Sequence, residues 1–155
     1  PMTPEGQHEV ALSILDIFKG GEVIVFAGMS SDAERKEVFT ITTTPSYRIE
    51  LESKGVDVRR DEPKSGVIGL AALITALGPL RDVKTCCTIA TTVGTSADPV
   101  AAQLLLERVR NWWNLSLPVP IDATERLVQK LQQMHTGKVE DYVSDLSESP
   151  NSIYM

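Results

Sequence analysis

The sequence contains few of the residues that mark metal sites, redox centres and membrane spans. Aromatic residues make up 5% of its 155 positions, and it has two histidines and two cysteines. No CxxC motif or histidine–cysteine spacing typical of a metal site is present. The longest apolar stretch, 67–77, is interrupted by Gly69 and Thr75 and is too short to cross a bilayer. We therefore expect no metal, no cofactor and no membrane partner.

The chain also lacks an excess of positive charge. Its 15 lysines and arginines stand against 21 aspartates and glutamates, which gives a formal net charge of -6. Without a basic field there is no general attraction to nucleic acid, so any RNA binding has to come from a local face. A hydrophobic content of 42% is ordinary for a globular protein, and we expect a single domain over 1–155.

A catalytic constellation is the next absence. Asp57, Asp61 and Glu62 lie in a charged segment that we expect to be a solvated loop. No serine, cysteine or histidine has the spacing of a nucleophile with its base. The paired glycines Gly20 and Gly21 mark a turn without the strand–loop–helix pattern of a phosphate cradle. The sequence therefore indicates a protein that is not an enzyme.

The two cysteines, Cys86 and Cys87, are neighbours in the chain. Adjacent cysteines rarely bond to each other because the disulfide would strain the peptide between them. One interpretation is a pair of small side chains on opposite faces of a strand. The other is a disulfide between two chains, which would join symmetry-related copies.

The first third of the sequence favours strands joined by tight turns. Segments 8–14 and 23–26 flank a glycine pair and indicate a β-hairpin. The run EVFTITTT over 37–44 is rich in residues that favour strands, and it stops at Pro45. Segment 47–52 alternates apolar and polar residues, which predicts a second hairpin.

The middle of the sequence changes character twice. Segment 67–77 is rich in alanine and leucine and predicts a short helix. Segment 82–93 is rich in threonine, valine and isoleucine and predicts a strand. Asp98 followed by proline resembles an N-cap with proline at the first helical position, which predicts a helix over 100–110.

Segment 111–119 alternates again, with apolar residues on one side and polar residues and one tryptophan on the other. It predicts a sheet with one apolar and one polar face. After it, Asp122 and Glu125 resemble a capping box. Two apolar stripes at helical spacing follow, and helices this short need another surface to cover them. The residues we expect in that contact are Leu127, Leu131, Met134, Val143 and Leu146.

The runs WWNLSL at 112–117 and VPIDAT at 119–124 resemble the last strand and first helix of coat proteins from small single-stranded RNA bacteriophages. The resemblance implies an α+β fold with an antiparallel β-sheet over 1–121, including a variable middle segment. It also implies a helical arm over 122–155 that packs across the sheet of a dimer partner.

This resemblance further implies a viral structural protein of the virion, assembled in the host bacterial cytoplasm. Its homodimers would form an icosahedral shell around single-stranded genomic RNA, and the open sheet face would bind an RNA hairpin. The implied RNA contacts are Trp112, Asn114, Arg110, Ser116, Thr40, Thr42 and Arg48. Each has a structural alternative, such as Trp112 packing against a loop. The alternative function is a dimeric α+β binding or assembly-regulating module that forms no shell.

Overall fold

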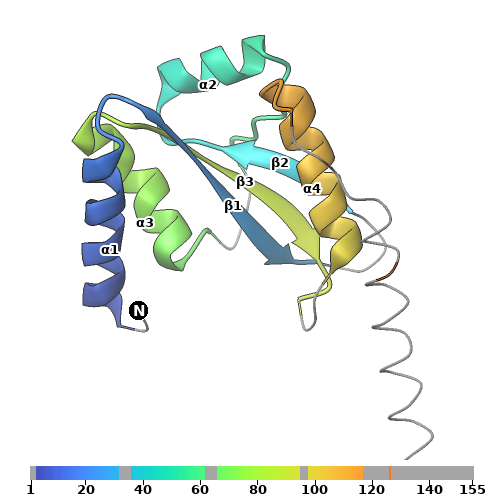
Figure 1. Cartoon of the computed structure of the whole chain (residues 1–155), viewed down its shortest axis with the longest axis horizontal. Coiled ribbons are helices and arrows are strands. Elements are labelled where there is room, and N and C mark those ends of the chain that lie inside the picture. Colours follow the sequence, from blue (N-terminus) through green and yellow to red (C-terminus); the bar gives the residue numbers. More distant parts are fainter. Residues whose placement is uncertain (1–2, 32–35, 62–65, 95–97, 117–125, 127–155) are drawn as a thin grey trace, which may run out of the picture. The chain divides into compact units, whose positions relative to one another are not determined.

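A computed structural model describes residues 3–31, 36–61, 66–94, 98–116 and 126 (Figure 1). The chain divides into the units Pro1–Pro118 and Val119–Met155, and every element named below belongs to the first. The prediction of one domain over 1–155 stays a prediction, since most of the second unit is not described. For the same reason, the five residues expected in the helical arm lie outside the described residues.

The described elements alternate between helices and strands along the chain. In order they are α1 (Pro4–Ile17), β1 (Glu22–Ser30), β2 (Val38–Ile41), α2 (Pro45–Ser53), α3 (Gly69–Leu77), η1 (Gly78–Arg81), β3 (Lys84–Thr92) and α4 (Pro99–Trp112).

The described strands form one mixed sheet in the order β1-β3-β2. The central strand β3 runs parallel to β1, with Glu22 opposite Lys84, and antiparallel to β2, with Val38 opposite Ala90. The predicted wholly antiparallel sheet is therefore wrong. A parallel pair needs a long crossover, and here the segment between β1 and β3 supplies it.

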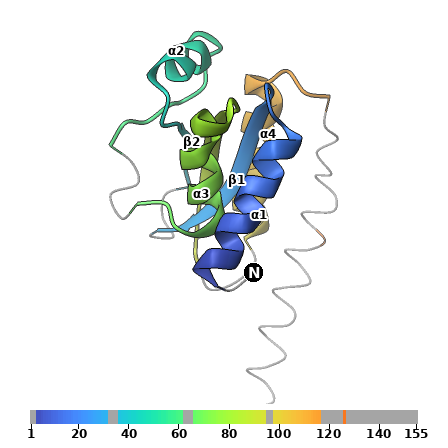
Figure 2. The same ribbon diagram turned by 90° about the vertical axis from the view of Figure 1, so that its left-hand side faces the viewer.

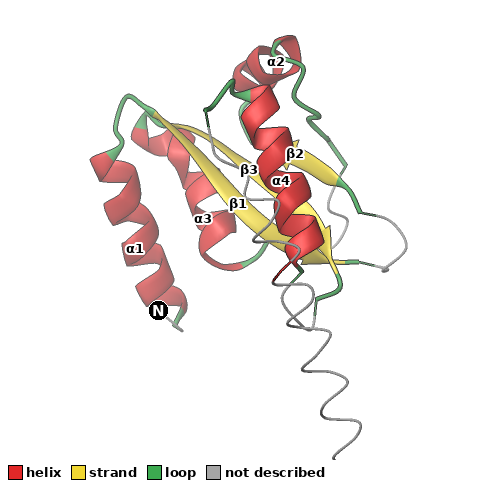
Figure 3. Cartoon of the chain, turned by 45° about the vertical axis from the view of Figure 1, so that its right-hand side comes forward, coloured by secondary structure: helices red, strands yellow, loops and turns green. Residues whose placement is uncertain are grey.

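Helices cover both faces of this sheet. Helices α1 and α3 pack on one face, around Leu15, Ile74 and Val83 (Figure 2). Helix α4 packs on the other face, where Ala101 contacts Val38 and Ala90 (Figure 3). Because both faces are covered, β3 is buried along nearly its whole length. The polar open face expected from the coat-protein resemblance does not exist in this sheet.

Helix α1 replaces the first predicted hairpin. Its start is fixed by Thr3, whose hydroxyl accepts from the Gly6 N–H at 3.2 Å, and by Pro4 at the first helical position. Ala11 and Leu15 are its buried residues, one helical turn apart. The apolar residues over 8–14 therefore belong to the buried face of a helix, with a period near 3.6 residues, and not to a strand with a period of two.

Helix α2 replaces the second predicted hairpin. Tyr47 and Leu51 are buried, whereas Ile49 is 67% exposed. Positions 47 and 51 share a face in a strand and in a helix, so only Ile49 distinguishes the two. Pro45 opens the helix at its first position and has no N–H for a strand ladder.

Helix α4 confirms the predicted start at Asp98. Its carboxylate accepts from the Ala101 N–H at 3.0 Å and from the Val93 N–H at 3.2 Å, and it pairs with the Lys36 ammonium. Burial opposes ionisation of Asp98, but these donors outweigh it and hold the pKa of the carboxyl below its ordinary value. Asp98 thus ties the start of α4 to the segments on either side of it.

The predicted last strand is instead the end of α4. Trp112 is its final residue, and Asn114 follows with a φ of 49°, in the left-handed region that asparagine tolerates. The Leu115 N–H donates to the Arg110 carbonyl at 3.1 Å, as in a Schellman turn. The alternation of apolar and polar residues over 111–116 therefore belongs to a capped helix end and not to a strand. The predicted helices over 67–77 and 100–110 and the predicted strands over 37–44 and 82–93 are confirmed in type.

Candidate protein-binding surface

The threonines expected to face RNA are interior residues. Thr40 is fully buried, and its hydroxyl lies 3.0 Å from that of Thr88 on the central strand. Thr42 is 7% exposed and donates to the Thr85 carbonyl at 2.8 Å. Both hydroxyls satisfy their hydrogen bonds inside the α/β sandwich, so neither can contact a nucleic acid.

The other expected RNA contacts do not share a face. Arg48 lies on α2, and its Nε is buried without a hydrogen-bond partner among the described residues. Trp112 packs partly buried against the clusters around Tyr47 and Val38. Arg110, Asn114 and Ser116 are exposed at and after the end of α4. The structure therefore does not assemble these residues into one site.

Cys86 and Cys87 point to opposite faces of β3, as one of the two interpretations held, and both are fully buried. Burial raises the pKa of the Cys86 thiol to about 12 and that of Cys87 to about 11. Both are protonated and inaccessible at neutral pH. An interchain disulfide stays a prediction, and it now requires the domain to open first.

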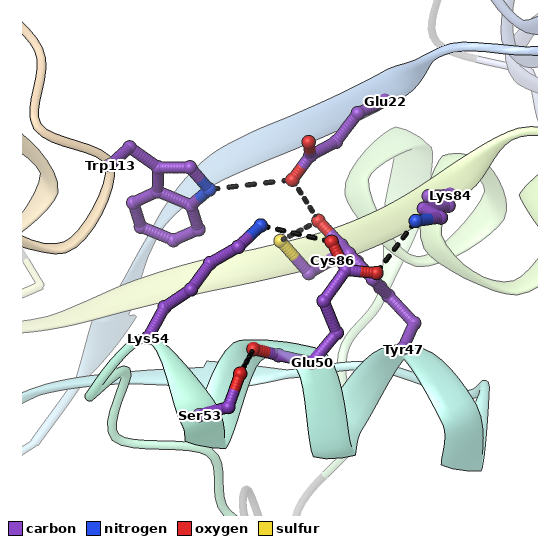
Figure 4. Close-up of polar contacts among 8 residues, drawn as sticks. All are labelled: Glu22, Tyr47, Glu50, Ser53, Lys54, Lys84, Cys86 and Trp113. Atoms are coloured by element: carbon purple, nitrogen blue, oxygen red, sulfur yellow. Dashed lines mark hydrogen bonds and ion pairs between the residues drawn. The ribbon is translucent and has the colours of Figure 1, made fainter.

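A polar cluster joins α2 to the start of the sheet (Figure 4). The Glu22 carboxylate on β1 accepts from the Tyr47 hydroxyl, and the Trp113 Nε1–H donates to it at 3.4 Å. Burial, and then the bond to Glu22, raises the pKa of the Tyr47 phenol, which keeps it a protonated donor. These contacts hold α2 and the end of α4 against β1, which is a structural role.

The outer edge of this cluster carries exposed charges. Glu50 lies between Lys84, 2.6 Å away, and Lys54, 3.0 Å away (Figure 4). The bonds from Lys84 and then Lys54 lower the pKa of the Glu50 carboxyl. Lys84 also lies 5.7 Å from the centre of the Tyr47 ring. Exposed pairs of this kind contribute little stability, but they present a patterned surface to a partner.

Next to these charges is an open cleft of about 410 Å³. It lies where β1 and β3 begin, between the turn after α1, the start of α2 and the η1 turn. Its lining includes Gly20, Gly21, Ser46, Glu50, Asp82 and Lys84. Of the residues that line this cleft, the sequence indicated only the glycine turn. The others come from separate elements that the fold brings together.

Large apolar side chains are exposed at the same end of the unit. Ile17 is 76% exposed, Phe18 49% and Leu80 78%. The end of α1 and η1 lie side by side, since Arg81 pairs with Asp16 at 2.8 Å (Figure 1). We call Ile17, Phe18 and Leu80 the end patch. Exposed apolar residues rimmed by charged ones are typical of protein-binding surfaces.

Metal sites and membrane-spanning helices are not found in the described part of the chain. No group of three His, Cys, Asp or Glu side chains there could hold a metal ion. None of the helices in those residues has the length and apolar character needed to traverse a membrane.

Comparison with known protein families gives one assignment. Residues 2–140 match the model of the PAC2 family. The chain belongs to the PAC2 family. A search of curated proteins gives no significant match.

Several solved structures share the fold of this PAC2 protein, among them the following three. The first is PbaA of Pyrococcus furiosus, described as an archaeal homolog of proteasome-assembly chaperone, at 22% identity and a TM-score of 0.75 over 100% of this chain and 66% of that one. PbaB of the same organism, described as an archaeal proteasome activator, has 23% identity and a TM-score of 0.73 over 90% and 60%. A protein of unknown function from Thermoplasma acidophilum has 19% identity and a TM-score of 0.62 over 96% and 60%. The chain thus spans about two thirds or less of these structures.

These findings overturn the coat-protein interpretation. Family, fold, shell formation, RNA partner and virion location were all inferred from one resemblance over roughly the last third of the chain, with its best-matching runs at 112–124, and all are wrong. That resemblance took 112–117 as a strand leading into a capped helix, whereas Trp112 is the last residue of α4 and 113–116 are not in a strand. The dimeric binding module that was the alternative is not supported either.

Proposed function

We propose that this PAC2 protein binds proteasome subunits or particles and promotes their assembly or activity, acting by binding and not by catalysis. The match to the PAC2 family over residues 2–140 carries the proposal. The printed descriptions of PbaA and PbaB, an archaeal homolog of proteasome-assembly chaperone and an archaeal proteasome activator, support it for proteins of the same fold.

The end patch and the neighbouring cleft are the contact surface we favour. Ile17 and Leu80 offer apolar area that burial would remove from water, at about 25 cal/mol per Å². Lys84, Glu50 and Asp82 at the cleft supply charges of both signs beside it. An apolar centre with a charged rim is the usual composition of a specific protein interface.

Binding to purified proteasome tests the function itself. We would mix the chain with proteasome α- and β-subunits from the organism that supplies this sequence. Native gels would follow complex formation, and peptide hydrolysis would follow the assembled particle. We expect a complex and a faster or more complete assembly. Absence of any complex, with either free subunits or assembled particles, would refute the proposal.

Two charge insertions test the surface separately. Ile17→Asp and Leu80→Asp should each weaken the complex by about five- to thirtyfold, because truncation or charging of a central apolar contact costs on the order of 1–2 kcal/mol. Val100→Asp is the matched control, since Val100 is 54% exposed but lies at the start of α4, outside the end patch and the cleft beside it. If both patch variants still form the complex with unchanged affinity, the contact surface lies elsewhere on the chain, but the proposed function is not refuted.

A further inference from the structure

The long outer edge of β1 has no strand beside it among the described residues. β1 has nine residues and pairs with β3 along one edge only, because the strand order is β1-β3-β2 (Figure 3). Short edge strands, prolines and inward charges are the usual protection of such an edge. Here 23–29 contains neither a charge nor a proline. This edge is therefore open to pairing with an added strand.

The register shows which peptide groups are available there. The Gly21 carbonyl accepts from the Lys84 N–H at 3.0 Å, and the Ser31 N–H donates to the Thr92 carbonyl at 3.0 Å. Peptide groups alternate between the two edges of a strand, so the odd-numbered residues of β1 bond to β3. The N–H and C=O groups of Ile24, Phe26 and Gly28 consequently point to the open edge.

A cleft lies on each face of the sheet beside the second half of β1. On the α4 face, a cleft of about 280 Å³ is lined by Phe26, Gly28 and Leu105, among other residues. On the α3 face, a cleft of about 300 Å³ is lined by Met29 and Ile68, among others. Both share Ala27 and Gly28, so the small residues of β1 leave space on either side of the same stretch.

Two apolar clefts on opposite faces match the side chains of one strand. Successive residues of a strand point to opposite faces, so an added strand would place alternate side chains in the two clefts. Ile68 is 86% exposed and Phe26 49%, so both offer apolar area for such a strand to cover. Glu22 at the start of the edge and the net charge of -6 favour a basic residue at its end.

We propose that an extended aliphatic segment of a partner polypeptide, flanked by basic residues, adds to the free edge of β1 and fills both clefts. The proposal does not rest on the proposed function. It uses a strand edge and two clefts that are separate from the end patch.

A labelled peptide provides the direct test. The probe is fluorescein-Lys-Val-Ile-Val-Leu-Val-Lys, whose two lysines place a cation near Glu22 in either direction. Fluorescence polarisation with the 155-residue chain should give micromolar affinity, because a heptapeptide covers less than a full protein interface. The same peptide N-methylated at two adjacent central residues should bind at least tenfold more weakly. Adjacent N–H groups point to opposite edges of a strand, so whichever edge faces β1 then lacks one hydrogen-bond donor.

Matched variants of the chain locate the binding. Phe26→Lys should weaken binding of the probe tenfold or more, whereas Ile49→Lys should leave it unchanged, since Ile49 is exposed on α2 and lines neither cleft. Ile68→Lys tests the second cleft at a highly exposed position, and circular dichroism checks that each variant folds. If Phe26→Lys fails to fold, Ile68→Lys alone decides.

Three results would overturn the proposal. The first is no binding of the unmodified probe. The second is binding that tolerates N-methylation or both edge variants. The third is pairing of β1 with β1 of a second copy in place of the probe, seen as self-association that Phe26→Lys removes.

Discussion

Replacement of Gly78 by alanine tests the packing between η1 and the central strand. Gly78 begins η1 with a φ of -49° and a ψ of -51°, a conformation that alanine adopts easily. A Cβ built there would lie 2.8 Å from the Cβ of Thr85, and closer still to the two atoms beyond it. Thr85 is fully buried and donates to the Thr75 carbonyl at 2.9 Å, so it has little room to turn.

Two effects of opposite sign compete at this position. Alanine lowers the entropy of the unfolded chain relative to glycine and should stabilise the fold by about 0.4–1 kcal/mol. Overpacking of a filled core costs about 1–3 kcal/mol, and displacing the Thr85 hydroxyl costs about 1 kcal/mol more. We therefore expect Gly78→Ala to lower the free energy of unfolding by about 1–3 kcal/mol.

Urea unfolding followed by circular dichroism measures this change, with the m-value held constant between variants. Combining Gly78→Ala with Thr85→Ala should cost less than the sum of the single changes, because Thr85→Ala removes the two atoms of the closest contacts. Gly28→Ala is the control, since its Cβ would meet only the Thr92 side chain, at 3.2 Å from the methyl group and 3.9 Å from the hydroxyl. A Gly78→Ala variant as stable as the wild type would show that this close approach does not exist.

The remaining predictions concern titratable groups. Asp98→Asn keeps the cap but loses the ion pair with Lys36, and should cost about 1–2 kcal/mol at pH 7. Because the folded pKa of Asp98 is lowered, its stabilisation exists above the unfolded pKa of about 3.9. The difference between the two proteins should therefore shrink as the pH falls below that value and be lost once the pH has passed below the lower folded pKa, in acid-unfolding curves. For the thiols, Cys86 and Cys87 should react with Ellman's reagent only after unfolding in denaturant; reaction in the native state at pH 7.5 would contradict their burial.

The parts of the fold that sequence analysis predicted are those with one dominant local signal. β3 is rich in β-branched residues and is buried on both faces, so its assignment as a strand did not depend on choosing a period. α4 begins with an aspartate and a proline whose cap is visible in the sequence itself. Such segments need no tertiary information to be assigned.

The parts that failed are amphipathic segments too short to fix their period. In α2, Tyr47 and Leu51 fit both a strand and a helix, and burial on Cys86 decides between them. At the end of α4, both tryptophans pack partly buried against the cluster around Tyr47, and the helix stops between them, so the following residues only resemble a strand pattern. The sequence of a short amphipathic segment does not show which element will pack against it. The resemblance to phage coat proteins depended on such a segment and was therefore wrong as well.

The candidate surface escaped prediction for a related reason. Glu22, Tyr47 and Lys84 are far apart in the sequence and meet only because β1 and β3 start together. The spacing of these residues in the sequence does not predict the cleft, because the cleft forms only when β1 and β3 pair in parallel. The buried threonines show the converse, since residues that favour strands were given a surface role when they fill an interior.

The central place of β3 has a consequence for how the chain folds during synthesis. β1 and β2 touch only β3 within the described sheet, and β1 meets it roughly sixty residues later in the chain. Until Thr92 has left the ribosome, β1 has no partner strand, β2 has only the single bridge between Thr40 and Val58, and α1 has only part of its core. Such distant pairing gives a high contact order and slow folding. The apolar edges of β1 stay exposed throughout that interval, which makes this segment a natural ligand for general chaperones.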